Sequence, residues 1–383
     1  MPGAASVVAV DAAVVVSSEA IRVLGAWLRM RIVLDILPPV SLRAILTPKL
    51  ALSLGAVALA GGALGACAGG AGSTVEGPSI VVTTSVLGDV VENLVGDQAA
   101  VEVLMPRGAD PHEAGLSSRQ ADDMSRADLV VINGAHFEQG MERVIESVEA
   151  DGTPVFAAAD HVDLLTFAEE HERQQAAGAA ADDEHAAGEG EGEGDKLGGD
   201  GHGHDEDDVD PHLWTDPRQM ATATGALSER LAEVDGIDAA ALGRATDAYL
   251  AALAALDAEV EQALAPLPDA DRVLVTNHEV FGYFADRYGF RVVGAVIPAG
   301  TTQAEPSSSD VTGLAEVIRD TGVPAVFAET SSPTALARAL ADDVGDVEVV
   351  ELFSESLGEP GSGGATYLEM MRTNAERIAE ALA

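Results

Sequence analysis

The sequence predicts an α/β protein with two lobes, each built on a mostly parallel sheet flanked by helices, and a long rigid helix that joins them. Three observations support this prediction. Short β-branched runs alternate with amphipathic stretches in both halves, which is the pattern of parallel sheets covered on both faces. An Ala- and Leu-rich stretch without proline separates the halves. The length of 383 residues suits two domains at roughly 150 residues each.

A leader and signal peptide is predicted over residues 1–66. The 17 residues Leu50–Ala66 carry no charge, and Arg43 and Lys49 precede them, which is typical of a secretory signal. Signal peptides rarely place so long a stretch before their apolar run. We therefore expect the natural start at Met30 or later.

The apolar run ends in Leu-Gly-Ala-Cys, which resembles a bacterial lipobox. Cys67 is therefore the predicted lipidation site, and the chain is expected outside the cell membrane, held there by that lipid. Residues 67–78 form the lipid-anchored linker, because their Gly- and Ser-rich sequence is typical of a flexible tether.

The N-terminal lobe is predicted to span residues 79–237. Its strands are expected at 80–84, 101–105, 128–133 and 155–156, where β-branched residues gather. Helices are expected over 85–94, from Ser117 or Ser118 onward, and up to Val148. Strand and helix alternate throughout, so the strands should be parallel.

The linking helix is predicted within residues 238–267. Its Ala/Leu-rich part, Asp238–Leu264, would extend for roughly 40 Å at about 1.5 Å per residue. A helix of this length would be a stiff spine between the lobes.

The C-terminal lobe is predicted over residues 268–383 and repeats the same alternation. Its strands are expected at 272–276, 291–296, 325–328 and 348–352, and its helices at 281–288, 310–320, 333–342 and 367–382.

Composition limits the function classes. The chain carries 64 acidic residues against 21 Lys and Arg, a formal net charge of −43 at pH 7. This charge repels phosphate backbones and attracts cations, so we expect no nucleic-acid partner. Cys67 is the single cysteine, which excludes an internal disulfide and a Cys-x-x-Cys metal site.

An acidic segment over residues 169–209 is predicted to be disordered, since it has almost no large apolar side chains. Its histidines are His171, His185, His202 and His204. Histidine among carboxylates suits divalent metals, so these four residues are candidate auxiliary metal ligands. The alternative is a solvated acidic loop without a binding role.

Three further histidines occupy comparable positions. His112 follows a predicted strand in Asp-Pro-His, His212 lies in Asp-Pro-His-Leu-Trp where Trp214 is expected to anchor the turn, and His278 follows the strand Arg-Val-Leu-Val-Thr. Ligands collect at the carboxyl ends of parallel strands. Three neutral imidazoles and one carboxylate form a tetrahedral set that suits Zn²⁺, at about 2.0–2.2 Å.

The carboxylate is expected from the second lobe. Glu355 follows the strand at 348–352 and is the first choice, while Glu329 also ends a strand and is the alternative. In a hydrolytic zinc enzyme the fourth position would instead hold water, with Glu279 or Glu113 as general base.

Long motifs give a specific resemblance. They are PRGADPHEA, DPHLWTDP, TNHEVFGYFADRYGF, EPSSSDVTGLAEVI, VFAETSSPTALARALADDVG, VELFSESLG and YLEMMRTN, over about residues 79–383. The sequence resembles the zinc- and manganese-binding solute receptors of ABC transporters, typified by the zinc-uptake receptors. The resemblance implies one metal in a cleft between two lobes, held by His112, His212, His278 and Glu355.

The resemblance also implies a function: a monomeric extracytoplasmic receptor that captures a metal ion and delivers it to an ABC permease. Manganese receptors of this family typically have a carboxylate at the third ligand position, where this chain has His278. Three nitrogens and one oxygen favour Zn²⁺ over the harder Mn²⁺. A manganese receptor is the first alternative and a zinc-dependent hydrolase the second.

Overall fold

The computed structural model describes residues 77–173 and 209–383, and the structural statements below concern these residues. The predictions for the leader, for Cys67 and for His185, His202 and His204 lie outside them. Within the described ranges, no helix is both long enough and apolar enough to cross a membrane.

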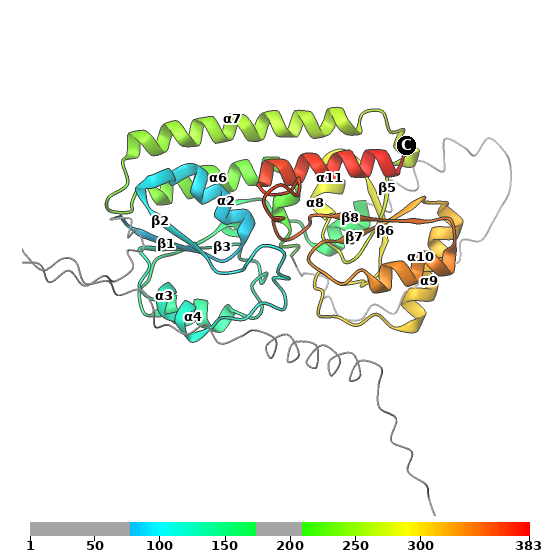
Figure 1. The fold of residues 1–383 in the computed structure, drawn as a ribbon, viewed down its shortest axis with the longest axis horizontal. Helices are drawn as coiled ribbons and strands as arrows, with labels where there is room; N and C mark the ends of the chain where they lie inside the picture. The colour runs from blue at the N-terminus through cyan, green and yellow to red at the C-terminus, as the bar shows by residue number, and fades with distance from the viewer. Residues whose placement is uncertain (1–76, 174–208) are drawn as a thin grey trace, which may run out of the picture. The chain divides into compact units, whose positions relative to one another are not determined.

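Two four-stranded parallel sheets form the framework (Figure 1). The first has the order β2-β1-β3-β4, with β1 Ser79–Val82, β2 Ala100–Val103, β3 Leu129–Ile132 and β4 Val155–Ala157. The second has the order β6-β5-β7-β8, with β5 Val273–Thr276, β6 Arg291–Ala295, β7 Ala325–Glu329 and β8 Glu348–Leu352. The strand order reverses beside the first strand of each sheet, which is where such folds bind ligands. The predicted two-lobe α/β architecture is confirmed.

Helices cover both sheets. In the first lobe they are α2 Ser85–Val95, α3 Ser118–Met124, α4 Glu142–Ala150 and α6 Pro217–Leu231. In the second they are α8 Gly282–Tyr288, α9 Ser308–Thr321, α10 Ala335–Val344 and α11 Tyr367–Ala381. Side chains alternate along β1: Ile80 and Val82 join the core with α2, whereas Val81 faces Met124 and Ile145 from α3 and α4. The first sheet is thus buried on both faces.

The helix α7, Ala239–Leu264, has 26 residues and extends for about 39 Å. Asp238 caps it by accepting the backbone N–H of Ala241 at 2.6 Å. Its buried side chains recur every three or four residues: Leu242, Thr246, Tyr249, Leu253, Leu256, Val260 and Leu264. This stripe packs on α2 and α6 of the first lobe and on α11 of the second, so one helix runs along both lobes (Figure 1).

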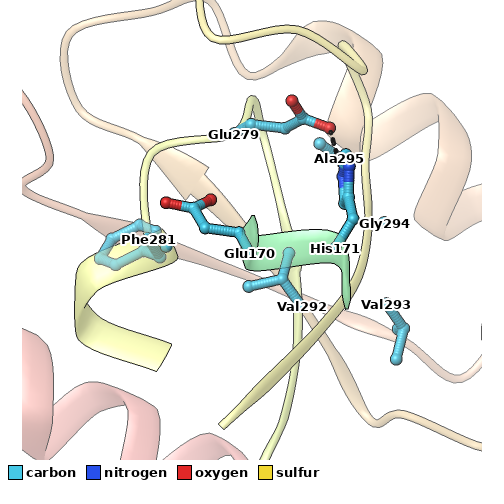
Figure 2. A pocket seen from close by; sticks show the side chains of 9 residues that line it. Glu170, His171, Glu279, Phe281, Val292, Val293, Gly294 and Ala295 are labelled. Atoms are coloured by element: carbon cyan, nitrogen blue, oxygen red, sulfur yellow. Dashed lines mark ion pairs between the residues drawn. The ribbon is translucent and has the colours of Figure 1, made fainter. Parts of the chain in front are cut away.

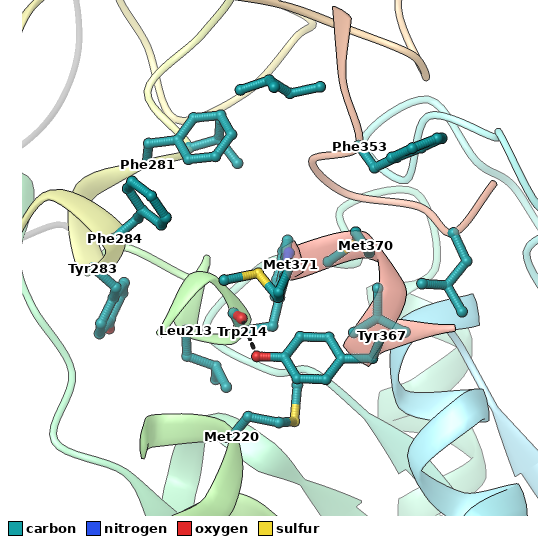
Figure 3. Close-up of a cluster of buried hydrophobic side chains, with 14 of the residues drawn as sticks. Leu213, Trp214, Met220, Phe281, Tyr283, Phe284, Phe353, Tyr367, Met370 and Met371 are labelled. Carbon is teal, nitrogen blue, oxygen red and sulfur yellow. Dashed lines mark hydrogen bonds between the residues drawn. The ribbon is translucent and has the colours of Figure 1, made fainter. Parts of the chain in front are cut away.

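Aromatic and sulfur-containing side chains connect the lobes beneath α7. Figure 3 shows Tyr367 at the start of α11 beside Met220 of α6 and Trp214. The Tyr367 hydroxyl donates to the Trp214 carbonyl at 2.6 Å, which ties the C-terminal helix to the turn that carries His212. Burial of such large side chains stabilises this junction by roughly 1.5–3 kcal/mol each.

The structure differs from several of the expectations. Helix α6 was not predicted, although Asp216 caps it and Pro217 opens it. Strand β2 ends at Val103 rather than at residue 105, yet Leu104 and Met105 still donate backbone hydrogen bonds of 2.8 and 3.0 Å to the β1 side. The acidic segment expected to be disordered from residue 169 begins as helix, since residues 167–173 are helical.

Candidate metal centre

The turns that carry His112 and His212 have the same local construction. In each Asp-Pro-His sequence the aspartate Oδ1 accepts the histidine backbone N–H at 2.9 Å. This is an Asx turn, and the intervening proline fixes its backbone. Both imidazoles are buried.

Two of the three histidines are oriented by a carboxylate that contacts the ring Nδ1. Asp210 Oδ1 lies 2.6 Å from Nδ1 of His212, and Glu329 Oε1 pairs with Nδ1 of His278. Ser354 donates to the other oxygen of Glu329 at 3.0 Å. A carboxylate on Nδ1 fixes the tautomer, so the lone pair on Nε2 is presented to the centre.

Four potential ligand atoms converge at the junction of the two lobes. Oε1 of Glu355 lies 2.7 Å from Nε2 of His112, 3.5 Å from Nε2 of His212 and 3.4 Å from Nε2 of His278. The four potential ligand atoms all lie within 4.8 Å of one another. A tetrahedral zinc ion with bonds of about 2.0–2.2 Å requires ligand atoms roughly 3.4 Å apart. The donor set therefore fits one such ion with little rearrangement.

The same atoms lack other partners. Nε2 of each histidine and both oxygens of Glu355 are buried and make no hydrogen bond within the described residues. Buried polar atoms are seldom left unpaired, because desolvation without a hydrogen bond costs about 1–3 kcal/mol each. These atoms contact one another but have no further partner among the described residues, which indicates a ligand that satisfies them together.

The protonation of the histidines and the ionisation of Glu355 in the centre depend on one another. Burial opposes the imidazolium form, but the Glu329 and Glu355 carboxylates hold the pKa of His278 well above its usual value. Burial likewise opposes the charge on His212, and Asp210 raises the pKa of His212 in spite of it. Burial also disfavours ionised Glu355, yet His278 and the other histidines hold the pKa of Glu355 well below its usual range. The carboxylate thus stays ionised as a ligand must.

Aromatic rings form the wall of the centre. The Phe137 ring meets His112 edge to face at 5.3 Å between centroids, and Trp214 meets His212 at 5.4 Å. Trp214 Nε1 donates to the Ser354 carbonyl at 2.7 Å, which anchors the turn as expected. Phe137 was missed in the sequence, where it follows a surface histidine with no hydrophobic periodicity to mark it.

The other candidate residues lie elsewhere. Glu329 holds His278 from behind and is not in the group of four. Glu113 is exposed and is not in the group of four. His171 Nε2 lies 3.4 Å from Glu279, and both line a cavity of about 110 Å³ together with buried Glu170 (Figure 2). Burial and the Asp210 carboxylate raise the pKa of Glu170 to about 11.

Comparison with known proteins identifies a family and its relatives. The family described as zinc-uptake complex component A, periplasmic, matches residues 80–381. The zinc-binding protein TroA of Treponema pallidum is 29% identical over 311 residues, which cover 80% of this chain and 89% of that protein. The manganese-binding lipoprotein MntA of Halalkalibacterium halodurans is 25% identical over 326 residues, covering 85% and 95%.

Solved structures of other proteins share this fold. The periplasmic zinc-binding protein TroA from Treponema pallidum superimposes with a TM-score of 0.66 at 28% identity, over 80% of this chain and 99% of that one. A crystal structure of ZnuA shares the fold with a TM-score of 0.62 at 23% identity, over 80% and 100% of the two chains.

Proposed function

We propose that this chain, which belongs to the family of zinc-uptake complex component A periplasmic proteins, captures Zn²⁺ outside the cytoplasm and delivers it to an ABC permease for import. The family consists of metal ABC transporter substrate-binding proteins and not of enzymes, so the hydrolase alternative is set aside. The observation that carries the proposal is the convergence of His112, His212, His278 and Glu355.

The mechanism is capture. A cation entering the centre exchanges its water for three Nε2 atoms and the Glu355 carboxylate. Because both lobes contribute ligands, binding holds them together, and a permease can recognise the closed form. The lipid on Cys67 keeps a monomeric receptor beside the membrane, and the net charge of −43 raises the local cation concentration.

The choice of zinc rests on the chemistry of the donors. Three imidazole nitrogens and one carboxylate oxygen are a borderline-soft, four-coordinate set, whereas Mn²⁺ prefers more oxygen ligands in an octahedron. Relatives are named for both metals, zinc in TroA and manganese in MntA.

We expect zinc to displace manganese from the purified protein, with a dissociation constant lower by roughly a hundred-fold or more. The test is competition between the two ions, followed by metal analysis of protein prepared without chelator. Equal retention of manganese would identify a manganese receptor instead.

The acidic segment is proposed as a weak cation collector. In it, His171, His185, His202 and His204 bind metal ions weakly before the ions reach the main centre. His171 is half-exposed beside Glu279, the residue after the ligand His278. Because residues 167–173 are helical and Glu170 is buried, a deletion that tests this role should begin at residue 174.

Deleting residues 174–208 is expected to slow zinc capture at low zinc while leaving the equilibrium affinity of the main centre within about three-fold, since the four ligands remain. Stopped-flow association rates and calorimetry on the same variant measure the two quantities. A matched control replaces the segment with a Gly/Ser linker of equal length. An unchanged association rate in both variants would assign the segment no collecting role.

A further inference from the structure

The two Asp-Pro-His turns are built alike but their side chains are held differently. Asp210 Oδ1 accepts from both the backbone and the ring Nδ1 of His212. Asp110 Oδ1 accepts only the backbone N–H of His112, and Nδ1 of His112 has no hydrogen-bond partner in the described chain. His278 has Glu329 on its Nδ1. Among the three ligand histidines, His112 is therefore the one whose ring Nδ1 contacts no carboxylate within the described residues.

Hydrogen bonds from the second lobe support the turn that carries His112 rather than Nδ1 of its ring. Oδ2 of Asp110 accepts the Thr302 hydroxyl at 2.7 Å and the Ser332 hydroxyl at 3.4 Å. Gln303 Nε2 donates to the His112 carbonyl. Thr302 and Gln303 lie in the loop between β6 and α9, and Ser332 lies in the loop between β7 and α10. The turn that carries His112 is thus held from the opposite lobe.

These contacts link ligand position to the distance between the lobes. Thr302 reaches Asp110 only while the second lobe stays against the first. When the lobes separate, the charged hydrogen bond breaks and the His112 turn loses its support, whereas Asp210 and Glu329 continue to orient the other two rings. His112 is then the ligand that leaves first.

We propose that Asp110 and Thr302 form a latch that positions His112 and couples metal release to lobe opening. The inference rests on the proposed function, because it takes His112 as a ligand of the transported ion. Asp110 and Thr302 are positioning residues in this scheme and do not touch the metal.

The test is the rate of zinc dissociation, measured by stopped flow after mixing the loaded protein with excess chelator. Thr302→Val removes the hydroxyl at nearly constant shape, and we expect dissociation roughly ten-fold faster with association changed by less than about two-fold. Thr302→Ser keeps the hydroxyl and should restore the slow rate. Thr312→Val is the matched control, since the Thr312 hydroxyl bonds only within α9.

The same substitution made in the His112→Ala protein distinguishes an effect on the position of His112 from a general effect on the packing of the lobes. In His112→Ala, the added Thr302→Val change should leave the dissociation rate unaltered, because the ligand it supports is gone. An equal acceleration in both backgrounds, or no acceleration in the wild-type background, would overturn the latch. If His112→Ala itself bound zinc as tightly as the wild type, the metal centre and the proposed function would be wrong, which is a distinguishable result.

Discussion

The His278→Ala variant is expected to lose tight zinc binding, with a dissociation constant several hundred-fold higher or more. Four ligands of a structural zinc site contribute about 10–16 kcal/mol together, or roughly 2.5–4 kcal/mol each, and about 1.4 kcal/mol corresponds to ten-fold in affinity. The change also leaves the buried Glu329 carboxylate without its imidazole partner. Competition against a chelating dye measures the dissociation constant.

His136→Ala is the control for this experiment. The side chain of His136 is 87% exposed and pairs at 2.8 Å with Glu142, away from the centre. Its removal should leave zinc affinity unchanged. Thermal unfolding of both metal-free variants shows whether each remains folded. Wild-type affinity in a folded His278→Ala protein would contradict the assignment of His278 as a ligand.

The strands could be predicted because their hydrophobic signal is local. Runs such as Ile80-Val81-Val82 are buried on both faces of a parallel sheet, so they appear as continuous apolar segments. Helix α6 could not be predicted because it lacks such a clear local hydrophobic signal. Its sequence mixes Thr, Gly and polar residues, and its apolar side chains Met220, Leu227 and Leu231 face α7 and the short turn Ala158–His161 rather than a sheet. Its start signal, Asp216 followed by Pro217, is equally typical of a turn.

The histidine ligands could be proposed from their positions after strands and in Asp-Pro-His turns. The carboxylate could not be fixed in the same way, because β7 and β8 are neighbours and Glu329 pairs in register with Leu352, three residues before Glu355. Both acids therefore reach the same edge of the sheet. Their roles separate only in three dimensions: the Leu357 backbone N–H donates to Ser85 Oγ of the first lobe at 2.9 Å, and this contact helps hold the Glu355 loop at the centre.

Lowering the pH is expected to release the metal, and to do so from a higher pH than free histidine would suggest. The pKa of His278 and the pKa of His212 are both raised, so protons compete with the ion already above the ordinary value of about 6.5. The pKa of Glu355 is lowered, so that ligand stays ionised through the same range. With two protons displaced per ion, affinity should fall by up to about a hundred-fold per pH unit below these raised values. Calorimetry over a series of pH values, in buffers of different ionisation enthalpy, measures both affinity and protons released.

Glu329→Gln tests the cause of this pH dependence. The amide oxygen can still accept from Nδ1 of His278, but it carries no charge, so the pKa of His278 should fall and the loss of affinity should move to lower pH. At high pH we expect affinity only about 10–100-fold weaker, as for a residue that orients a ligand. Glu142→Gln, beside the exposed His136, is the matched control and should leave the profile in place. A loss as deep as that of His278→Ala would make Glu329 a ligand. A profile that does not move would show that the proton competing with the metal is not held on His278.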